Sequence, residues 1–177
     1  LVVHNNPRGG SHKWVMDIRE RLCIKSPLIK SRNQLEEGLN SFKRSDRITL
    51  IINSFLNTDI TVQDVMTLHK KYHFHIIIPI HDWYWFYPGA KTHAVHTAYL
   101  QENVRLGRDV SELFRLCDKV TTPTKFVYNR LRSVYKGKNM KIEPWDDYDP
   151  RDSAADRRVL KDHGINIGVL VDNLEHK

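Results

Sequence analysis

The segment FHIIIPI at residues 74–80 limits most strongly what this chain can fold into. Its centre is β-branched and apolar on both faces of an extended strand, a composition typical of parallel strands that helices cover on both sides. The run RITLIINSF at 47–55 has the same continuous apolar character. These strands alternate with amphipathic helical segments, and such alternation predicts an α/β domain with a mainly parallel sheet.

Shorter strands and the helices between them complete this pattern. Strands are expected at 1–3, 26–31, 119–123, 140–142 and 165–171. One predicted helix is capped by Ser11 and presents Trp14, Val15, Ile18 and Leu22 on one face; others present Leu35, Leu39 and Phe42, or Val110, Leu113, Phe114 and Cys117. TVQD at 61–64 has the form of a capping box, and Thr124 is predicted to cap the helix that follows it. The expected architecture is a Rossmann-like open sheet with helices on both faces.

Length and composition limit the size of the domain and the kind of partner it can bind. The 177 residues of the chain suffice for one well-buried domain, and the net charge of +7 favours an anionic partner. Two distant cysteines, Cys23 and Cys117, suggest buried, reduced thiols rather than a disulfide framework. The chain opens with LVV instead of Met, so we expect a fragment of a longer protein.

Ligands of open parallel sheets bind beyond the carboxyl ends of the strands. That rule selects four segments, at 4–10, 53–59, 81–96 and 122–124. In the first, Gly9 and Gly10 precede a helix, where a backbone without Cβ atoms can approach an anion such as a phosphate. A simple tight turn that feeds the helix explains the two glycines equally well.

The segment IPIHDWYWFYP at 78–88 carries the most unusual side chains. His81 leaves the predicted strand directly and could bind a substrate or act as an acid or base. The aromatic residues that follow at 83–87 form either a surface on which sugars or bases stack, or a core cluster over the edge of the sheet. The core alternative applies most to Trp85 and Phe86. The chain has ten histidines, but none follows a zinc-binding pattern, so a metal site is not expected.

Four segments together resemble the N-terminal half of GT-B fold glycosyltransferases, in particular the glycosyltransferase family 4-like N-terminal domain. GGSHKWVMDI at 9–18 is similar to the family's glycine loop, and IPIHDWYWFYP to its strand that ends in His-Asp. Two later segments are also similar to the family. One is LCDKVTTPTKF at 116–126, which matches a later helix cap, and the other is INIGVLVDNLEHK at 165–177, which matches the first strand of the second domain. KIEPWDDYDP at 141–150 departs from the family's usual turn.

The resemblance implies transfer of a sugar from a nucleotide-sugar donor to a glycan, protein or lipid-linked acceptor, without a metal cofactor. By resemblance, His81 is the catalytic residue beside the transferred sugar. Gly9, Gly10 and Ser11 would bind the donor phosphates, and the acceptor would meet Arg8, His12, Lys13, Asp82, Trp83 and Tyr84. The second domain supplies most donor contacts in this family, so the parent protein, not the fragment alone, would be the active enzyme.

The resemblance also sets the expected organisation: a Rossmann-like domain at 1–145, a linker at 146–164, and the first strand of a truncated second domain at 165–177. The missing C-terminal Rossmann-like domain is an implied partner, and no specific nucleic acid is expected. The expected location is the cytoplasm or the periphery of a membrane. The alternative is a non-catalytic Rossmann-like module that binds a nucleotide or a polyanion through its basic surface.

Overall fold

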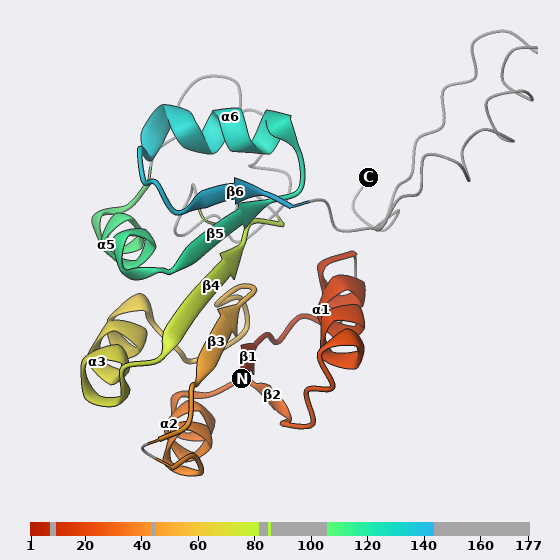
Figure 1. Cartoon of the computed structure of the whole chain (residues 1–177), viewed down its shortest axis with the longest axis vertical. Helices are drawn as coiled ribbons and strands as arrows, with labels where there is room; N and C mark the ends of the chain where they lie inside the picture. The colour runs from red at the N-terminus through yellow and green to blue at the C-terminus, as the bar shows by residue number, and fades with distance from the viewer. Residues whose placement is uncertain (8–9, 44, 82–84, 86–105, 144–177) are drawn as a thin grey trace, which may run out of the picture.

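A parallel six-stranded sheet forms the centre of the molecule (Figure 1). The computed structural model describes residues 1–7, 10–43, 45–81, 85 and 106–143. The strand order is β2-β1-β3-β4-β5-β6, and every neighbouring pair is parallel. The strands are β1 (Val2–Val3), β2 (Leu28–Ile29), β3 (Thr49–Ile52), β4 (His75–Pro79), β5 (Lys119–Thr122) and β6 (Met140–Ile142). The predicted Rossmann-like α/β class is confirmed.

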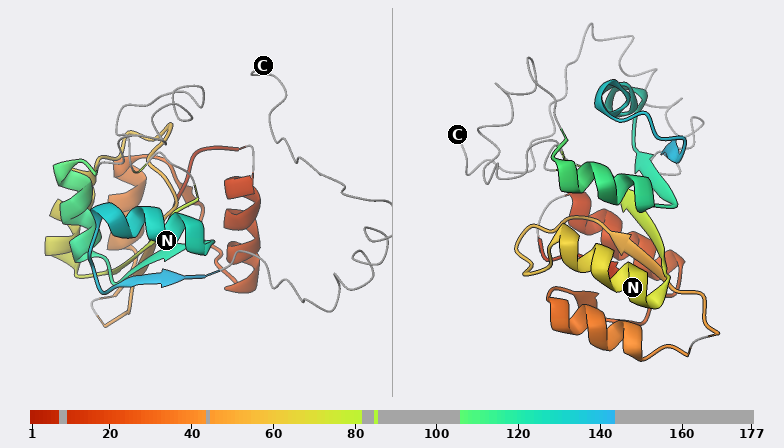
Figure 2. Two further views of the ribbon diagram at one scale, coloured as in Figure 1. Left: turned by 90° about the horizontal axis from the view of Figure 1, so that it is seen from above. Right: turned by 90° about the vertical axis from the view of Figure 1, so that its left-hand side faces the viewer.

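Helices cover both faces of this sheet (Figure 2). On one face stands α1 (Gly10–Arg21), next to the β1–β3 part of the sheet. The other face carries α2 (Arg32–Asn40), α3 (Val62–Tyr72), α5 (Arg108–Leu116) and α6 (Lys125–Val134). Because a strand's side chains alternate between faces, β3 serves both layers: Leu50 and Ile52 join the larger core, and Ile51 packs with Val15 of α1.

Helix boundaries follow the predicted caps at two of three places. Thr61 and Asp64 form the capping box of α3, and the Thr124 hydroxyl accepts the N–H of Val127 at the start of α6. The prediction that Ser11 caps α1 is wrong, because the helix begins at Gly10 and Ser11 lies within its first turn.

Three predicted core positions are exposed because their helices end before them. α1 ends at Arg21, so Leu22 is 60% exposed, and Cys23 turns the chain away with a positive φ and an exposed thiol. The expectation that both cysteines are buried is therefore wrong for Cys23. Similarly, α2 ends at Asn40 and leaves Phe42 on the surface.

Several expectations fall outside the described residues. They include most of the long loop after β4, the linker at 146–164 and the strand at 165–171. Within the described part, no helix combines the length and the apolar character needed to cross a membrane.

Asn139 ties the turn between α6 and β6 to the end of α5. Its Nδ2 donates to the carbonyls of Phe114 (2.8 Å) and Cys117 (2.7 Å), which the end of the helix leaves without intrahelical donors. Its Oδ1 lies 2.9 Å from the hydroxyl of Tyr135, whose single hydrogen also reaches the Phe114 carbonyl at 2.7 Å. The Asn139 amide thus donates to two carbonyls at the end of α5.

Asn139→Ala should lower the free energy of unfolding by about 2 kcal/mol, because the two hydrogen bonds that its amide donates, of roughly 1 kcal/mol each, are lost. Urea denaturation with an unchanged m-value is the measurement. The matched control is Asn129→Ala on the exposed surface of α6, which should change stability by less than about 0.5 kcal/mol. Equal effects of the two substitutions would contradict the role assigned to Asn139.

Candidate functional site

The strand order creates a topological switch point at one edge of the sheet. The chain leaves β1 toward β2 on one side and later returns to place β3 on the other side. The carboxyl ends of β1 and β3 therefore flank a topological switch point, where open α/β sheets bind ligands. The helix α1 starts from the same edge, with the positive dipole end and the first-turn N–H groups that have no acceptor within the helix.

Buried polar side chains gather at this edge. Within the described residues, each buried polar residue lies at the carboxyl end of a strand: His4 after β1, Asn53 and Ser54 after β3, and Thr121 and Thr122 at the end of β5. Burying a polar group costs free energy unless it is hydrogen-bonded. Their collection at the edge where ligands bind is therefore the strongest sign of a functional site in this fold.

His4 connects two elements through hydrogen bonds. Its Nδ1 lies 3.0 Å from Nδ2 of Asn53, and its Nε2 lies 3.2 Å from Nδ1 of His12 on α1. Burial lowers the pKa of His4; nearby positive charges at His12 and Lys30 lower it further, against an opposing hydrogen bond with the backbone of Asn6. His4 is therefore neutral at physiological pH.

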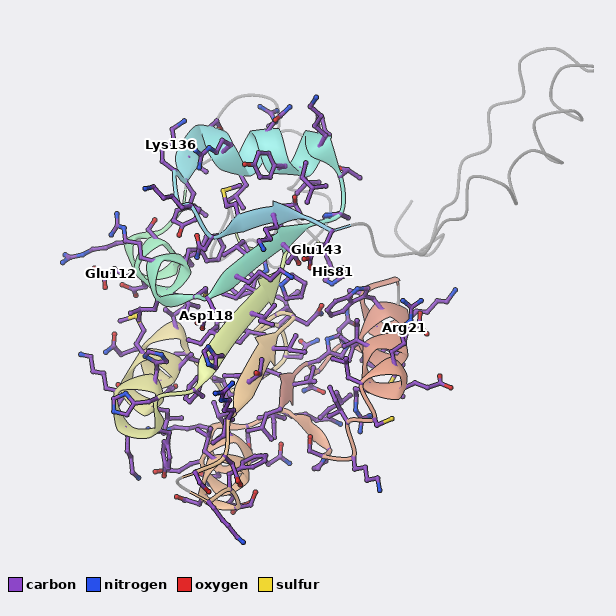
Figure 3. The ribbon with its side chains drawn as sticks, viewed as in Figure 1. Arg21, His81, Glu112, Asp118, Lys136 and Glu143 are labelled. Carbon is purple, nitrogen blue, oxygen red and sulfur yellow. The ribbon has the colours of Figure 1, made fainter. Side chains whose placement is uncertain are left out.

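His81 lies one residue beyond Ile80, where β4 reaches the same edge (Figure 3). Its ring packs against Trp14 of α1, with ring centroids 4.4 Å apart at an angle of 58°. Burial lowers the pKa of His81 to about 3, with a smaller contribution from the charge of His4. At neutral pH this imidazole is a neutral hydrogen-bonding group, with little tendency to take up a proton.

No family model, curated protein or solved structure matches this chain. The groups at this site are neutral imidazoles, an amide, an indole and the first turn of a helix. Such groups bind hydroxyls and anions without a net negative charge to repel them.

The structure brings some of the predicted site residues together. Gly10, Ser11, His12 and Lys13 form the first turn of α1, and His81 lies against the next residue of that helix, Trp14. Arg8, Gly9, Asp82, Trp83 and Tyr84 lie outside the described residues. Among the described residues, no three His, Cys, Asp or Glu side chains are grouped to hold a metal ion.

Two residues of the site lie in the segments selected at 4–10 and 53–59, but the sequence reasoning did not single them out as site residues. His4 and Asn53 each follow a short apolar strand directly, in the segments VVH and IIN. A polar residue immediately after a buried strand, in two strands flanking a switch point, is a signal that could have identified them. The strand order needed to use that signal comes only from the fold.

Proposed function

We propose that this chain is the acceptor-side half of a GT-B glycosyltransferase, which transfers a sugar from a nucleotide-sugar donor to an acceptor. The observation that supports this proposal is the contact between His81, at the end of β4, and Trp14, in the helix that Gly10 opens. Residues far apart in sequence, and predicted to act on one substrate, thus share one edge of a Rossmann-like sheet.

The chemistry of that edge suits a nucleotide-sugar. The first turn of α1 offers backbone N–H groups and a positive dipole end to a diphosphate. His81, neutral and partly buried, would exchange hydrogen bonds with a sugar hydroxyl instead of transferring a proton, because a group with a pKa of about 3 is a weak base at neutral pH. Trp83 and Tyr84 remain the proposed acceptor side. A second Rossmann-like domain would complete the active enzyme.

Binding of nucleoside diphosphates tests this proposal. By calorimetry, the chain should bind at least one of UDP, GDP and ADP. Gly10→Val and His81→Ala should each weaken that binding about tenfold or more, equivalent to about 1.4 kcal/mol. A β-branched side chain at Gly10 would block close approach to the first turn, and His81→Ala would remove a ring that supports the edge.

His75→Ala is the matched control, since His75 begins the same strand at the opposite edge and pairs with Asp118 at 2.8 Å. It should leave nucleotide binding unchanged. If Gly10→Val and His81→Ala have no more effect than His75→Ala, the carboxyl edge is not the nucleotide site and the proposal fails.

A second candidate, binding of a polyanion, is favoured by the distribution of charge. Residues 119–143 hold seven Lys or Arg and one acidic residue, Glu143, which pairs with Lys119. They make up β5, α6 and β6 at one end of the sheet (Figure 1). Binding there would weaken steeply with salt for heparin or nucleic acid alike, and Lys136→Glu would weaken it, whereas Gly10→Val would not.

A further inference from the structure

Asn53 is a buried polar residue at the switch point whose side-chain hydrogen bonding is incomplete. It is 3% exposed and follows β3 directly. Its backbone N–H donates to the carbonyl of Val3 at 3.1 Å, and its Nδ2 lies 3.0 Å from His4 Nδ1. Its Oδ1 is buried and has no hydrogen-bond partner within the described part of the chain. One half of the amide is thus paired and the other half is not.

This unpaired half remains whichever way the amide is turned. With Nδ2 toward His4, the oxygen of Asn53 lacks a donor, and with the amide turned over, the nitrogen would lack an acceptor. A neutral imidazole can carry its proton on either nitrogen, so His4 suits both arrangements. An unpaired buried amide group costs free energy in either case. The folded chain therefore keeps an unsatisfied polar group at the edge where ligands of such sheets bind.

A hydroxyl is the ligand group that suits both orientations of this amide. It donates one hydrogen bond and accepts others, so it can pair with the oxygen or with the nitrogen of Asn53. A phosphate oxygen only accepts and an ammonium group only donates, so each would suit a single orientation. The chemistry of the unpaired half therefore favours a hydroxyl, such as those on a sugar ring.

The start of α1 adds a second requirement for the ligand. His12, in the first turn of this helix, has its Nδ1 3.2 Å from Nε2 of His4, the residue whose other ring nitrogen faces Asn53. The helix start and the unpaired amide are therefore separated by a single imidazole ring. The positive dipole end of the helix and its first-turn N–H groups favour an anion. A ligand that meets both positions carries a phosphate and a hydroxyl on one framework, as nucleotides and sugar phosphates do.

We propose that Asn53 is a ligand-binding residue that pairs the unpaired half of its amide with a hydroxyl of a phosphorylated sugar or nucleotide held at the start of α1. The choice of a nucleotide-sugar as this ligand rests on the proposed function. The hydroxyl then belongs either to the ribose or to the transferred sugar. Asn53 would discriminate against ligands without that hydroxyl, because they leave its amide unpaired.

Contact between a ligand and Asn53 requires the loops after β1 and β3 to separate, because the side chain is buried in the free chain. These loops meet at Asn5 and Asn57. Nδ2 of Asn5 donates to the Asn57 carbonyl, and Nδ2 of Asn57 donates to the Asn5 carbonyl at 3.5 Å. Both hydrogen bonds are exposed, so water can replace them at little cost. The joint between Asn5 and Asn57 is therefore where the ligand would enter.

Calorimetry of the full chain with UDP, GDP and ADP, each with and without attached glucose, tests this role. Asn53→Leu keeps the approximate size of the side chain but removes its polar atoms, and it should weaken binding of the glucose conjugate about tenfold. An equal loss for the nucleotide without glucose assigns the hydroxyl to the ribose, and a loss confined to the conjugate assigns it to the sugar. Asn129→Leu, on the exposed surface of α6, should change neither affinity. Unchanged binding of both ligands in Asn53→Leu would overturn the proposal.

Urea denaturation of the free chain separates this role from a purely structural one. Asn53→Leu loses the contact with His4 but also removes an unpaired buried group, and His4 keeps its hydrogen bond with the backbone of Asn6. The midpoint of unfolding should therefore stay close to that of the wild type. A large fall in the midpoint would show that the amide serves the fold, against the proposal.

Two further arms keep the result decisive. If Asn53→Leu does not fold, the wild type decides, because removing both the glucose and the ribose hydroxyls from the ligand should then weaken binding about tenfold or more. Equal affinity for such a dideoxyribose analogue would exclude the hydroxyl contact. If no nucleotide binds, the proposed function fails and glucose-1-phosphate is the remaining probe. Binding of this sugar phosphate that Asn53→Leu weakens would support the site, and no binding would refute it together with the proposed function.

Discussion

Trp85→Ala should lower the free energy of unfolding by about 3–5 kcal/mol, the range measured when a buried aromatic side chain is truncated. Trp85 is 1% exposed. Its ring lies edge-on to Phe55 at 5.5 Å and tilted against Phe114 at 5.7 Å. The substitution would open a cavity between the segment after β3 and helix α5. Since domains are commonly stable by only 5–15 kcal/mol, the variant should unfold at a much lower urea concentration.

The matched control is Phe126→Ala, at a ring that is 65% exposed on α6. It should change the free energy of unfolding by less than about 0.5 kcal/mol. Both variants are measured by urea denaturation followed by circular dichroism, with an m-value equal to that of the wild type. If truncating Trp85 costs no more than truncating Phe126, Trp85 does not belong to the core.

The burial of Trp85 also decides which of two roles this residue of the aromatic segment at 83–87 has. The sequence allowed either a stacking surface or a core cluster for these residues, and the core alternative is confirmed for Trp85. Its aromatic neighbours in this segment lie outside the described residues. Periodicity could not separate the two roles, because a run of consecutive aromatic residues shows no alternation of apolar and polar positions that would indicate which side chains are buried.

Much of the fold could be predicted because its signals are local. The apolar run at 74–80 marks β4, and the Thr61–Asp64 capping box marks the start of α3 within one residue. The errors arose where tertiary packing or the direction of the chain decides where a helix ends. The apolar residues repeat with helical spacing as far as Leu22, but α1 ends at Arg21, and Cys23 with its positive φ turns the chain away. A residue's preference for φ above zero is visible in sequence mainly for glycine.

The site was less predictable because it depends on strand order. His81 could be selected by its place after a strong strand, but its partner Trp14 comes from a helix 67 positions away in the printed sequence. His4 and Asn53 become neighbours only because β3 lies next to β1. Nothing in the residues near either one specifies that pairing, so the polar group at their edge appears only in three dimensions.

Between pH 7 and pH 5 the free energy of unfolding should fall by about 2 kcal/mol because of His81 alone. Burial lowers the pKa of His81 from 6.5 to about 3 in the folded chain. Below pH 6.5 the unfolded chain therefore binds a proton at His81, whereas the folded chain does not. This protonation stabilises the unfolded state. The stability is fully present above pH 6.5 and is lost as the pH falls toward 3. His4, whose pKa burial also lowers, adds to the same decline.

Urea denaturation at pH 7, 6 and 5 measures this slope, and His81→Phe identifies its source. The phenylalanine ring keeps the apolar contact with Trp14 but carries no titrating group, so the decline from pH 7 to pH 5 should be about 2 kcal/mol smaller than in the wild type. His75→Phe, at an exposed ring on the same strand, should keep most of the wild-type decline. Ordinary carboxylates titrate near pH 4 and below, so they contribute little in this range. An unchanged slope in His81→Phe would mean that His81 reaches solvent and takes up protons in the folded chain. In that case it would be free to act as an acid or base on a substrate, and the hydrogen-bonding role proposed for it would have to be replaced by proton transfer.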